Sequence, residues 1–178
     1  VTFENNFCSF SGCSSLKSIN VPYGVTSIYF VNCTSLESIT LPNSITNIGR
    51  AVFENCSSLK SINIPSSVVS IDECAFRYCH SLKNITIPYG VANIGVGAFY
   101  DCSSLESINL ADSIASIGQD AFKNCSSLKS IKIPKGVTHI KSSVFSGCSS
   151  LESIIIPSSV ANIACDFSGC TELKEVHI

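Results

Sequence analysis

SLKSINIPSSVVSIDECAFRYC, residues 58–79, is the stretch of this 178-residue chain that decides its fold. It is one copy of a unit of about 23 residues that recurs along almost the whole chain. Leucines in the position of Leu59 mark the recurrence, because successive ones stand 20, then five times 23, then 22 residues apart. These leucines are Leu16, Leu36, Leu59, Leu82, Leu105, Leu128, Leu151 and Leu173. A repeat of this length is typical of a solenoid.

Other residue types hold fixed positions relative to each leucine. A cysteine stands three residues before it, a phenylalanine stands six residues before it, and all six prolines share one further position. The cysteines are Cys13, Cys33, Cys56, Cys79, Cys102, Cys125, Cys148 and Cys170, and the phenylalanines are Phe10, Phe30, Phe53, Phe76, Phe99, Phe122, Phe145 and Phe167. The sequence therefore predicts about eight stacked coils in which equivalent side chains form columns.

Each unit begins with a predicted strand. Ile62 and Ile64 alternate with Asn63 at the period of a strand, so that the isoleucines face inward and Asn63 faces out. Pro65 ends the strand, because proline cannot donate a backbone hydrogen bond to a neighbouring strand. The rest of the unit supplies further apolar contacts on the far side of the coil and closes the core. One unit cannot bury these residues alone, but units stacked at roughly 4.8 Å can.

The unit resembles the BspA-like leucine-rich repeats. Their motif, L-x-x-I-x-I/L-P-x-x-V/I-x-x-I-G-x-x-A-F-x-x-C, matches the chain over essentially its whole length. The resemblance implies one right-handed leucine-rich repeat solenoid over residues 1–178, rich in β-structure with short turns or 3-10 segments, and with a parallel sheet on the concave side. It also implies a location at the cell surface or outside the cell, and adhesion to host matrix proteins or to neighbouring cells.

Two units depart from the motif. The first lacks three residues between Ile28 and Phe30, and the second lacks one between Ile163 and Phe167. The chain also begins inside a unit at Val1, ends on an open strand, and contains no methionine. We therefore expect either that the chain is a fragment that continues in a longer protein or that it self-associates through its unprotected end coils.

Composition and motifs argue against several functions. The net charge is −2 and the eleven Lys and Arg residues are dispersed, which disfavours nucleic acid as a partner. Apolar residues come in short groups, so no membrane insertion is expected. His80, His139 and His177 stand on different coils, and the motifs of hydrolases and nucleotide-binding proteins are absent from the sequence. We therefore expect no enzyme, no catalytic residues and no cofactor.

Eleven cysteines raise the question of disulfides or metal. Eight share one repeat position, which predicts a column of buried thiols that resist alkylation. Cys8, Cys74 and Cys165 stand elsewhere, two residues before a phenylalanine, and are expected to react first. Each of the three could also pair with the cysteine five residues later. The sequence contains no C-x-x-C, so no metal site is expected.

The outward positions of the predicted strands form the candidate ligand-binding surface. Together with two tyrosines on the proline-side rim, the candidates are Asn20, Thr40, Asn63, Thr86, Asn109, Lys132, Tyr23 and Tyr89. A neighbouring column of alternating Lys and Glu, beginning with Lys17 and Glu37, predicts ion pairs between coils. Four Asn-x-Ser/Thr sequons are either turn positions of the repeat or glycosylation sites, namely Asn32, Asn55, Asn84 and Asn124.

The function predicted from these features is that of a protein-binding or adhesion module of a cell-surface or secreted protein. Its partner would be an extracellular matrix protein or a protein of a neighbouring cell, bound through the concave face. The alternative is a structural spacer whose repeats display another domain. The sequence does not identify the ligand.

Overall fold

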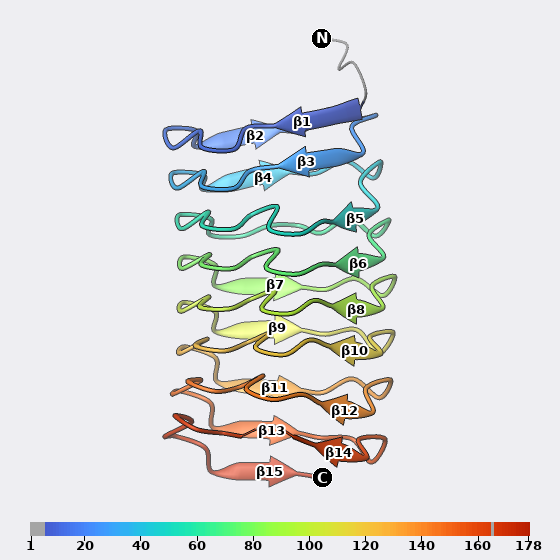
Figure 1. The fold of residues 1–178 in the computed structure, drawn as a ribbon, viewed down its shortest axis with the longest axis vertical. Helices are drawn as coiled ribbons and strands as arrows, with labels where there is room; N and C mark the ends of the chain where they lie inside the picture. Colours follow the sequence, from blue (N-terminus) through green and yellow to red (C-terminus); the bar gives the residue numbers. More distant parts are fainter. Residues whose placement is uncertain (1–5, 165) are drawn as a thin grey trace.

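The computed structural model describes residues 6–164 and 166–178. The chain winds through about 7 turns of a parallel-stranded solenoid with almost no helix, which confirms the predicted fold class. Figure 1 shows the coils stacked along one axis, with β1 (Phe7–Ser9) at one end of the stack and β15 (Glu175–His177) at the other. Short strands occupy two faces of the stack, and turns connect them.

The first face, which we call the Ile-x-Ile face, consists of the predicted strands. They are β2 (Ser18–Asn20), β4 (Ser38–Thr40), β7 (Asn84–Thr86), β9 (Ser107–Asn109), β11 (Ser130–Lys132), β13 (Ser153–Ile155) and β15 (Glu175–His177). All pairings are parallel, in the orders β2-β4, β7-β9 and β11-β13-β15. Residues 61–64 form no regular strand, but Ile62 and Ile64 are buried and Asn63 is exposed. The predicted alternation of inward and outward side chains is therefore correct even where the pairing of strands is interrupted.

The second face carries strands that the sequence did not predict as such. They are β1 (Phe7–Ser9), β3 (Ser27–Tyr29), β5 (Asn47–Ile48), β6 (Ser70–Ile71), β8 (Asn93–Ile94), β10 (Ser116–Ile117), β12 (His139–Ile140) and β14 (Asn162–Ile163). They pair in parallel as β1-β3, β5-β6-β8-β10 and β12-β14. The break between β3 and β5 falls where the shortened coil containing Ile28 meets the first full-length coil.

The core between the two faces contains the predicted columns. The phenylalanine rings stack from Phe10 to Phe167, with neighbouring centroids 5.2–6.1 Å apart and ring planes within 15° of parallel. The six rings from Phe30 to Phe145 are completely buried. Leucines and isoleucines of the repeat are buried beside them. The hydrophobic interior is therefore continuous from coil to coil.

The turns that lead back to each cysteine contain two left-handed positions. The residue before each cysteine of the repeat has a φ between 56° and 79°. These residues are Gly12, Asn32, Asn55, Tyr78, Asp101, Asn124, Gly147 and Gly169. The second position, two residues before the phenylalanine, has a φ between 55° and 58° at Ala51, Cys74, Gly97, Asp120 and Ser143. Residues at both positions donate their own N–H groups to the next coil, for example Ala51 to the Glu73 carbonyl at 2.9 Å and Asn55 to the Arg77 carbonyl at 2.8 Å.

Candidate binding surfaces

The Ile-x-Ile face presents the predicted outward residues in register. Asn20 lies opposite Thr40, Thr86 opposite Asn109, and Lys132 opposite Ile155. All six predicted face residues are exposed, including Asn63. The structure therefore brings them together as one polar strip along the stack, because successive parallel strands hold equivalent residues side by side.

In the columns beside this polar strip, side chains of adjacent coils form ion pairs and hydrogen bonds with one another. Lys60 Nζ lies 2.6 Å from Glu37 Oε2, and Lys174 Nζ lies 3.3 Å from Glu152 Oε2. The hydrogen bond and charge of Lys60 lower the pKa of the Glu37 carboxyl. Ser107 Oγ donates to Asn84 Oδ1 at 2.6 Å. The full column is Lys17, Glu37, Lys60, Lys83, Glu106, Lys129, Glu152 and Lys174, in which six of the seven steps join opposite charges. Two of these six steps are ion pairs in the structure.

Tyr23 and Tyr89 stand at the edge of the Ile-x-Ile face, each directly after the proline that ends a strand. Their exposed fractions are 86% and 78%, larger than for any other described aromatic side chain. Three coils separate them, which corresponds to roughly 14 Å along the stack. Neither ring has an aromatic partner within the described parts of the chain. Most of the surface of both tyrosines is therefore available to another molecule.

The cysteine column is a ladder of hydrogen bonds. Each thiol from Cys33 onward donates to the phenylalanine carbonyl of the preceding coil, at sulfur–oxygen distances of 3.0–3.2 Å. None of the ten described cysteines forms a disulfide. Burial raises the pKa of the Cys56 thiol to about 12. These thiols are structural hydrophobes with a satisfied donor, and they are poor nucleophiles.

Three cysteines behave differently from the sequence prediction. Cys13, expected to be buried, is exposed, and Cys170 is only half-buried. Cys13 has no earlier coil among the described residues to accept its hydrogen bond. Cys8, expected to react early, is buried, because the short first coil places it opposite Ile28 in an inward strand position. Cys74 is half-buried, and its early reaction stays a prediction; Cys165 lies outside the described residues.

The four sequon asparagines lie in two environments. Asn32, Asn55 and Asn124 occupy the left-handed position before a cysteine, with φ values of 59–62°. Asn55 Nδ2 donates to Asn32 Oδ1 at 3.0 Å. Asn84 lies in β7 and is exposed. The backbone thus accounts for asparagine at three of the four sites, while glycosylation stays a prediction.

The three histidines are on different coils, as predicted. His80 Nε2 lies 3.3 Å from Asp101 Oδ2, and His177 Nε2 lies 3.1 Å from Glu175 Oε2. His139 Nδ1 lies 2.9 Å from Thr138 Oγ1. Across residues 6–164 and 166–178, no three His, Cys, Asp or Glu side chains are grouped as metal ligands would be.

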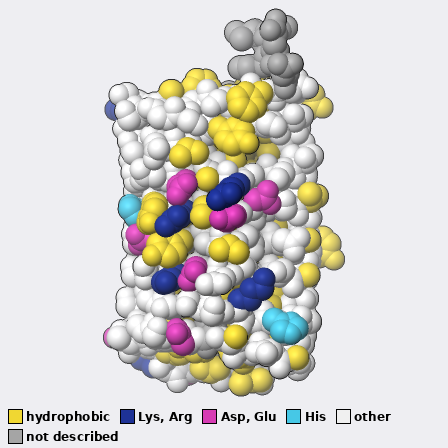
Figure 2. Space-filling view, viewed as in Figure 1, with side chains coloured by type: hydrophobic (Ala, Val, Ile, Leu, Met, Phe, Trp, Pro, Cys, Tyr) yellow, Lys and Arg dark blue, Asp and Glu magenta, His cyan; other side chains and the backbone are white. Residues whose placement is uncertain are grey.

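A second surface, which the sequence did not predict, lies on the turns that follow the second face. We call it the Arg77 patch, and it consists of Arg50, Glu54, Arg77, Tyr78, Tyr100 and Lys123. The Arg77 guanidinium lies 4.7 Å from the Tyr78 ring centre and 5.1 Å from that of Tyr100. It also lies 3.6 Å from Glu54 and donates to the Tyr78 hydroxyl at 2.9 Å. In Figure 2 charged side chains of both signs gather with hydrophobic ones over the middle of the visible face.

The Arg77 patch gathers residue types that dominate protein interfaces. It contains both arginines of the chain and two of its five tyrosines. Arginine and tyrosine are enriched among the residues that contribute most to binding, and the Ile-x-Ile face itself has neither. Sequence analysis missed the patch because its central column holds four different residue types at equivalent positions of successive units, namely Glu54, Arg77, Tyr100 and Lys123. A search for repeated features does not detect such a column.

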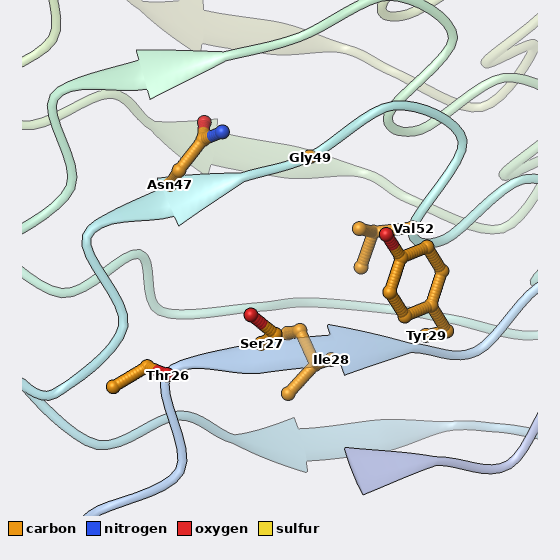
Figure 3. A pocket seen from close by; sticks show the side chains of 7 residues that line it. All are labelled: Thr26, Ser27, Ile28, Tyr29, Asn47, Gly49 and Val52. Carbon is orange, nitrogen blue, oxygen red and sulfur yellow. The ribbon is translucent and has the colours of Figure 1, made fainter. Parts of the chain in front are cut away.

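The surface of the described residues includes the following open hollows. The first, of about 120 Å³, lies between β3 and the next coil, where the shortened unit leaves a step. Figure 3 shows Thr26, Ser27 and Tyr29 on one side and Asn47, Gly49 and Val52 on the other. The second, of about 440 Å³, adjoins Glu54 and Tyr78. The third, of about 220 Å³, adjoins Arg77 and Tyr100.

Comparison with known proteins agrees with the repeat architecture. The family described as "BspA type Leucine rich repeat region" matches residues 6–118 and 92–178, with six copies. No curated protein matches the chain. Within the described residues, no helix is long and apolar enough to cross a membrane.

Several solved structures are similar. A leucine-rich cell surface protein from Faecalibacterium prausnitzii is 30% identical with a TM-score of 0.63, over 93% of this chain and 60% of that one. A leucine-rich repeat protein from Bacteroides ovatus is 32% identical with a TM-score of 0.69, over 94% and 56%. The T. pallidum leucine-rich repeat protein is 29% identical with a TM-score of 0.79, over 88% and 78%. The chain thus spans 60% or less of the first two proteins.

Proposed function

The chain belongs to the BspA-type leucine-rich repeat family, and we propose that it is a protein-binding module of a cell-surface or secreted protein. The family and its solved neighbours are repeat scaffold proteins, and one neighbour is a cell surface protein. In this proposal the module binds a protein of the host matrix or of a neighbouring cell and carries out no reaction. The contact surface is the Ile-x-Ile face together with its tyrosine rim.

The exposure of Tyr23 and Tyr89 carries the proposal. Two tyrosine rings that are 86% and 78% exposed offer large apolar surface to a partner at a small cost in conformational entropy. The polar strip beside them, with Asn63 and Thr86, provides donors and acceptors at a fixed spacing. An apolar anchor next to an ordered polar surface is the usual arrangement of a protein interface.

A binding screen tests this function. The chain would be immobilised and exposed to matrix proteins and to cell-surface extracts by biolayer interferometry. For any protein that binds, the double variant Tyr23→Ala/Tyr89→Ala should weaken the affinity by about tenfold or more. Val69→Ala, which removes an exposed side chain from the second face, is the control and should leave affinity unchanged.

The competing function is a rigid spacer. The continuous phenylalanine stack and the coil-to-coil backbone hydrogen bonds give the stack the stiffness that a spacer needs. A spacer predicts no binding partner in the screen. A partner whose affinity is unaffected by the tyrosine variants would show that the module binds through another surface, and the proposed contact would be wrong.

A further inference from the structure

The Arg77 patch contains a charge pattern that is complementary to itself in reverse order. One column of the patch, on four successive coils, carries Glu54, Arg77, Tyr100 and Lys123. Backbone hydrogen bonds fix this order: Asn55 N–H donates to the Arg77 carbonyl at 2.8 Å, and Asp101 N–H donates to the Lys123 carbonyl at 2.8 Å. The four side chains are therefore evenly spaced along the stack.

We propose that the Arg77 patch binds a second copy of this chain in an antiparallel, two-fold symmetric dimer. Turning one copy end over end places Glu54 opposite Lys123 of the second copy. The same rotation places Arg77 opposite Tyr100 of the second copy. In a two-fold interface every contact occurs twice, so both the ion pair and the cation–π contact are repeated.

The adjoining column supports the same alignment. It carries Asn55, Tyr78, Asp101 and Asn124 on the same four coils. In the antiparallel arrangement Tyr78 faces Asp101 of the second copy, where the phenol can donate to the carboxylate. Asn55 faces Asn124 of the second copy, and two amides can bond to each other. Neither column brings two like charges together.

A hollow in the patch lies where the lysine of the second copy would arrive. It is lined by Val31, Asn32, Glu54, Asn55 and Tyr78, and its volume is about 440 Å³. Its polar lining includes one carboxylate and two amide side chains, which suit an ammonium group. The antiparallel alignment directs Lys123 of the second copy to the coil that carries Glu54, and hence to this hollow.

The parallel alignment of two copies is disfavoured by the same residues. If both copies ran in the same direction, the symmetry axis would set Glu54 against Glu54 and Arg77 against Arg77. Like charges at an interface cost free energy, and they select against that register. The charge pattern therefore specifies the relative direction of the two copies as well as the partner.

The patch is also held in shape before binding. Arg77 is fixed by two tyrosine rings and by Glu54, and Lys123 lies 3.5 Å from Asp120 and 5.8 Å from the Tyr100 ring centre. Side chains that are already ordered lose little entropy on association. The patch spans only four coils, so we expect a weak dimer of the transient class.

Charge reversal combined with mixing tests the proposal in solution. Sedimentation equilibrium of the whole chain should show a monomer–dimer equilibrium. Glu54→Lys alone and Lys123→Glu alone should each weaken the dimer by about tenfold or more, because each creates two like-charge contacts. An equimolar mixture of these two variants should associate again, since every contact in the mixed dimer then joins Lys and Glu.

The control is Lys141→Glu, which has the same composition and net charge as Lys123→Glu. Lys141 is exposed on a coil outside the patch, so this variant should dimerise like the unchanged chain. Circular dichroism checks that each variant is folded. If a reversal unfolds the chain, Glu54→Gln and Lys123→Gln replace it, and each should weaken the dimer by a smaller factor.

Three outcomes would overturn the proposal. They are a chain that stays monomeric at millimolar concentration, reversals that do not weaken association, and a mixture that associates no better than its components. Association through the end coils would give polymers that respond to none of these charges. The proposed function rests on a different face, so loss of the dimer leaves partner binding by Tyr23 and Tyr89 unaffected.

Discussion

At the scale of the residue, the repeat imposes one local requirement at each position. The position before each cysteine has a left-handed backbone, which asparagine, aspartate and glycine adopt more readily than other residues. Seven of its eight occupants are of these types, and Tyr78 is the exception. The exception lies in the Arg77 patch, where its ring contacts Arg77. A residue that costs local strain is thus retained where its side chain forms the surface cluster.

The phenylalanine column can be tested at one ring. Phe99 is completely buried, and its ring centre lies 5.2 Å from Phe76 and 5.5 Å from Phe122. Phe99→Ala should lower the free energy of unfolding by about 3–5 kcal/mol, because it removes buried surface and leaves a cavity. Urea denaturation measures the loss. A loss below about 1 kcal/mol would mean that the coils collapse around the gap.

The buried thiols predict a loss of stability in alkaline solution. Burial raises the pKa of Cys56 from 9.0 to about 12, and it raises those of Cys79, Cys102 and Cys125 well above 9.0. Above pH 9 the unfolded chain releases these four protons and the folded chain retains them. The free energy of unfolding therefore falls as the pH rises, whereas below pH 9 the thiols add no pH dependence.

The size of this effect follows from the number of thiols. Each contributes at most about 1.4 kcal/mol per pH unit, so these four together contribute at most about 5.6 kcal/mol per pH unit. Urea denaturation at several pH values between about 8 and 11 measures the slope. Cys102→Ala should make the slope shallower by up to about 1.4 kcal/mol per pH unit, which is the contribution of one thiol. An unchanged slope in that variant would assign the alkaline loss to other groups.

At the scale of the element, the sequence predicted the features that recur with the repeat period. The inward-facing isoleucines, such as Ile62 and Ile64, and the stacked phenylalanines follow from regular spacing, and both are present. Residues 61–64 themselves form no regular strand, so the period predicted their burial but not their pairing. The second set of strands was missed, because each such strand contributes one inward residue, too few to show a period of two. The Arg77 patch was missed because its residues differ from coil to coil.

The cysteine predictions failed at the ends of the column for a related reason. A cysteine in the repeat position is buried only where an adjacent coil packs against it. The repeat period alone does not show at which coil this packing ends. Cys13 is exposed although Cys33, one coil later, is fully buried. Coil length matters too, since the shortened first coil places Cys8 in a strand rather than in a turn.

Close packing of successive turns can be tested with two glycines. A Cβ on Gly118 would lie 2.5 Å from the backbone of Gly95, closer than any real contact. Gly118→Ala should therefore cost about 2–3 kcal/mol, since two coils must separate. Gly97→Ala should cost only about 1 kcal/mol, because its left-handed φ is strained but its surroundings leave room. Thermal or urea unfolding compares the two, and equal losses would show that the coils part easily.

At the scale of the whole molecule, the chain is a one-dimensional stack. Side-chain hydrogen bonds between coils join residues 19–26 positions apart, which is one repeat in either direction. A coil therefore stabilises a distant coil only through the coils that lie between the two. The stability of such a protein is close to a sum of coil and interface contributions. Coils in the middle have two neighbours, and coils at the ends have one.

Hydrogen exchange should reveal this arrangement as a gradient along the stack. The amide of Phe99, which donates to the Ala121 carbonyl at 2.8 Å, lies among completely buried residues. The amide of Ile156 donates to the His177 carbonyl at 2.7 Å, but Val176 and Ile178 beside it are 47% and 86% exposed. We expect the slowest exchange in the central coils and progressively faster exchange toward both ends, because end coils can open alone.

Phe99→Ala distinguishes this gradient from a simple difference in exposure. In a nearest-neighbour stack, weakening the central coil should let the two halves exchange at separate rates, since the contact that couples them is the one removed. Phe167→Ala, at the half-buried end of the ring column, should speed exchange only in the adjacent coils. Mass spectrometry of peptic fragments measures both patterns. Uniform acceleration of every coil by Phe167→Ala would mean that the chain opens as one cooperative unit, and the description as a sum of coils would be wrong.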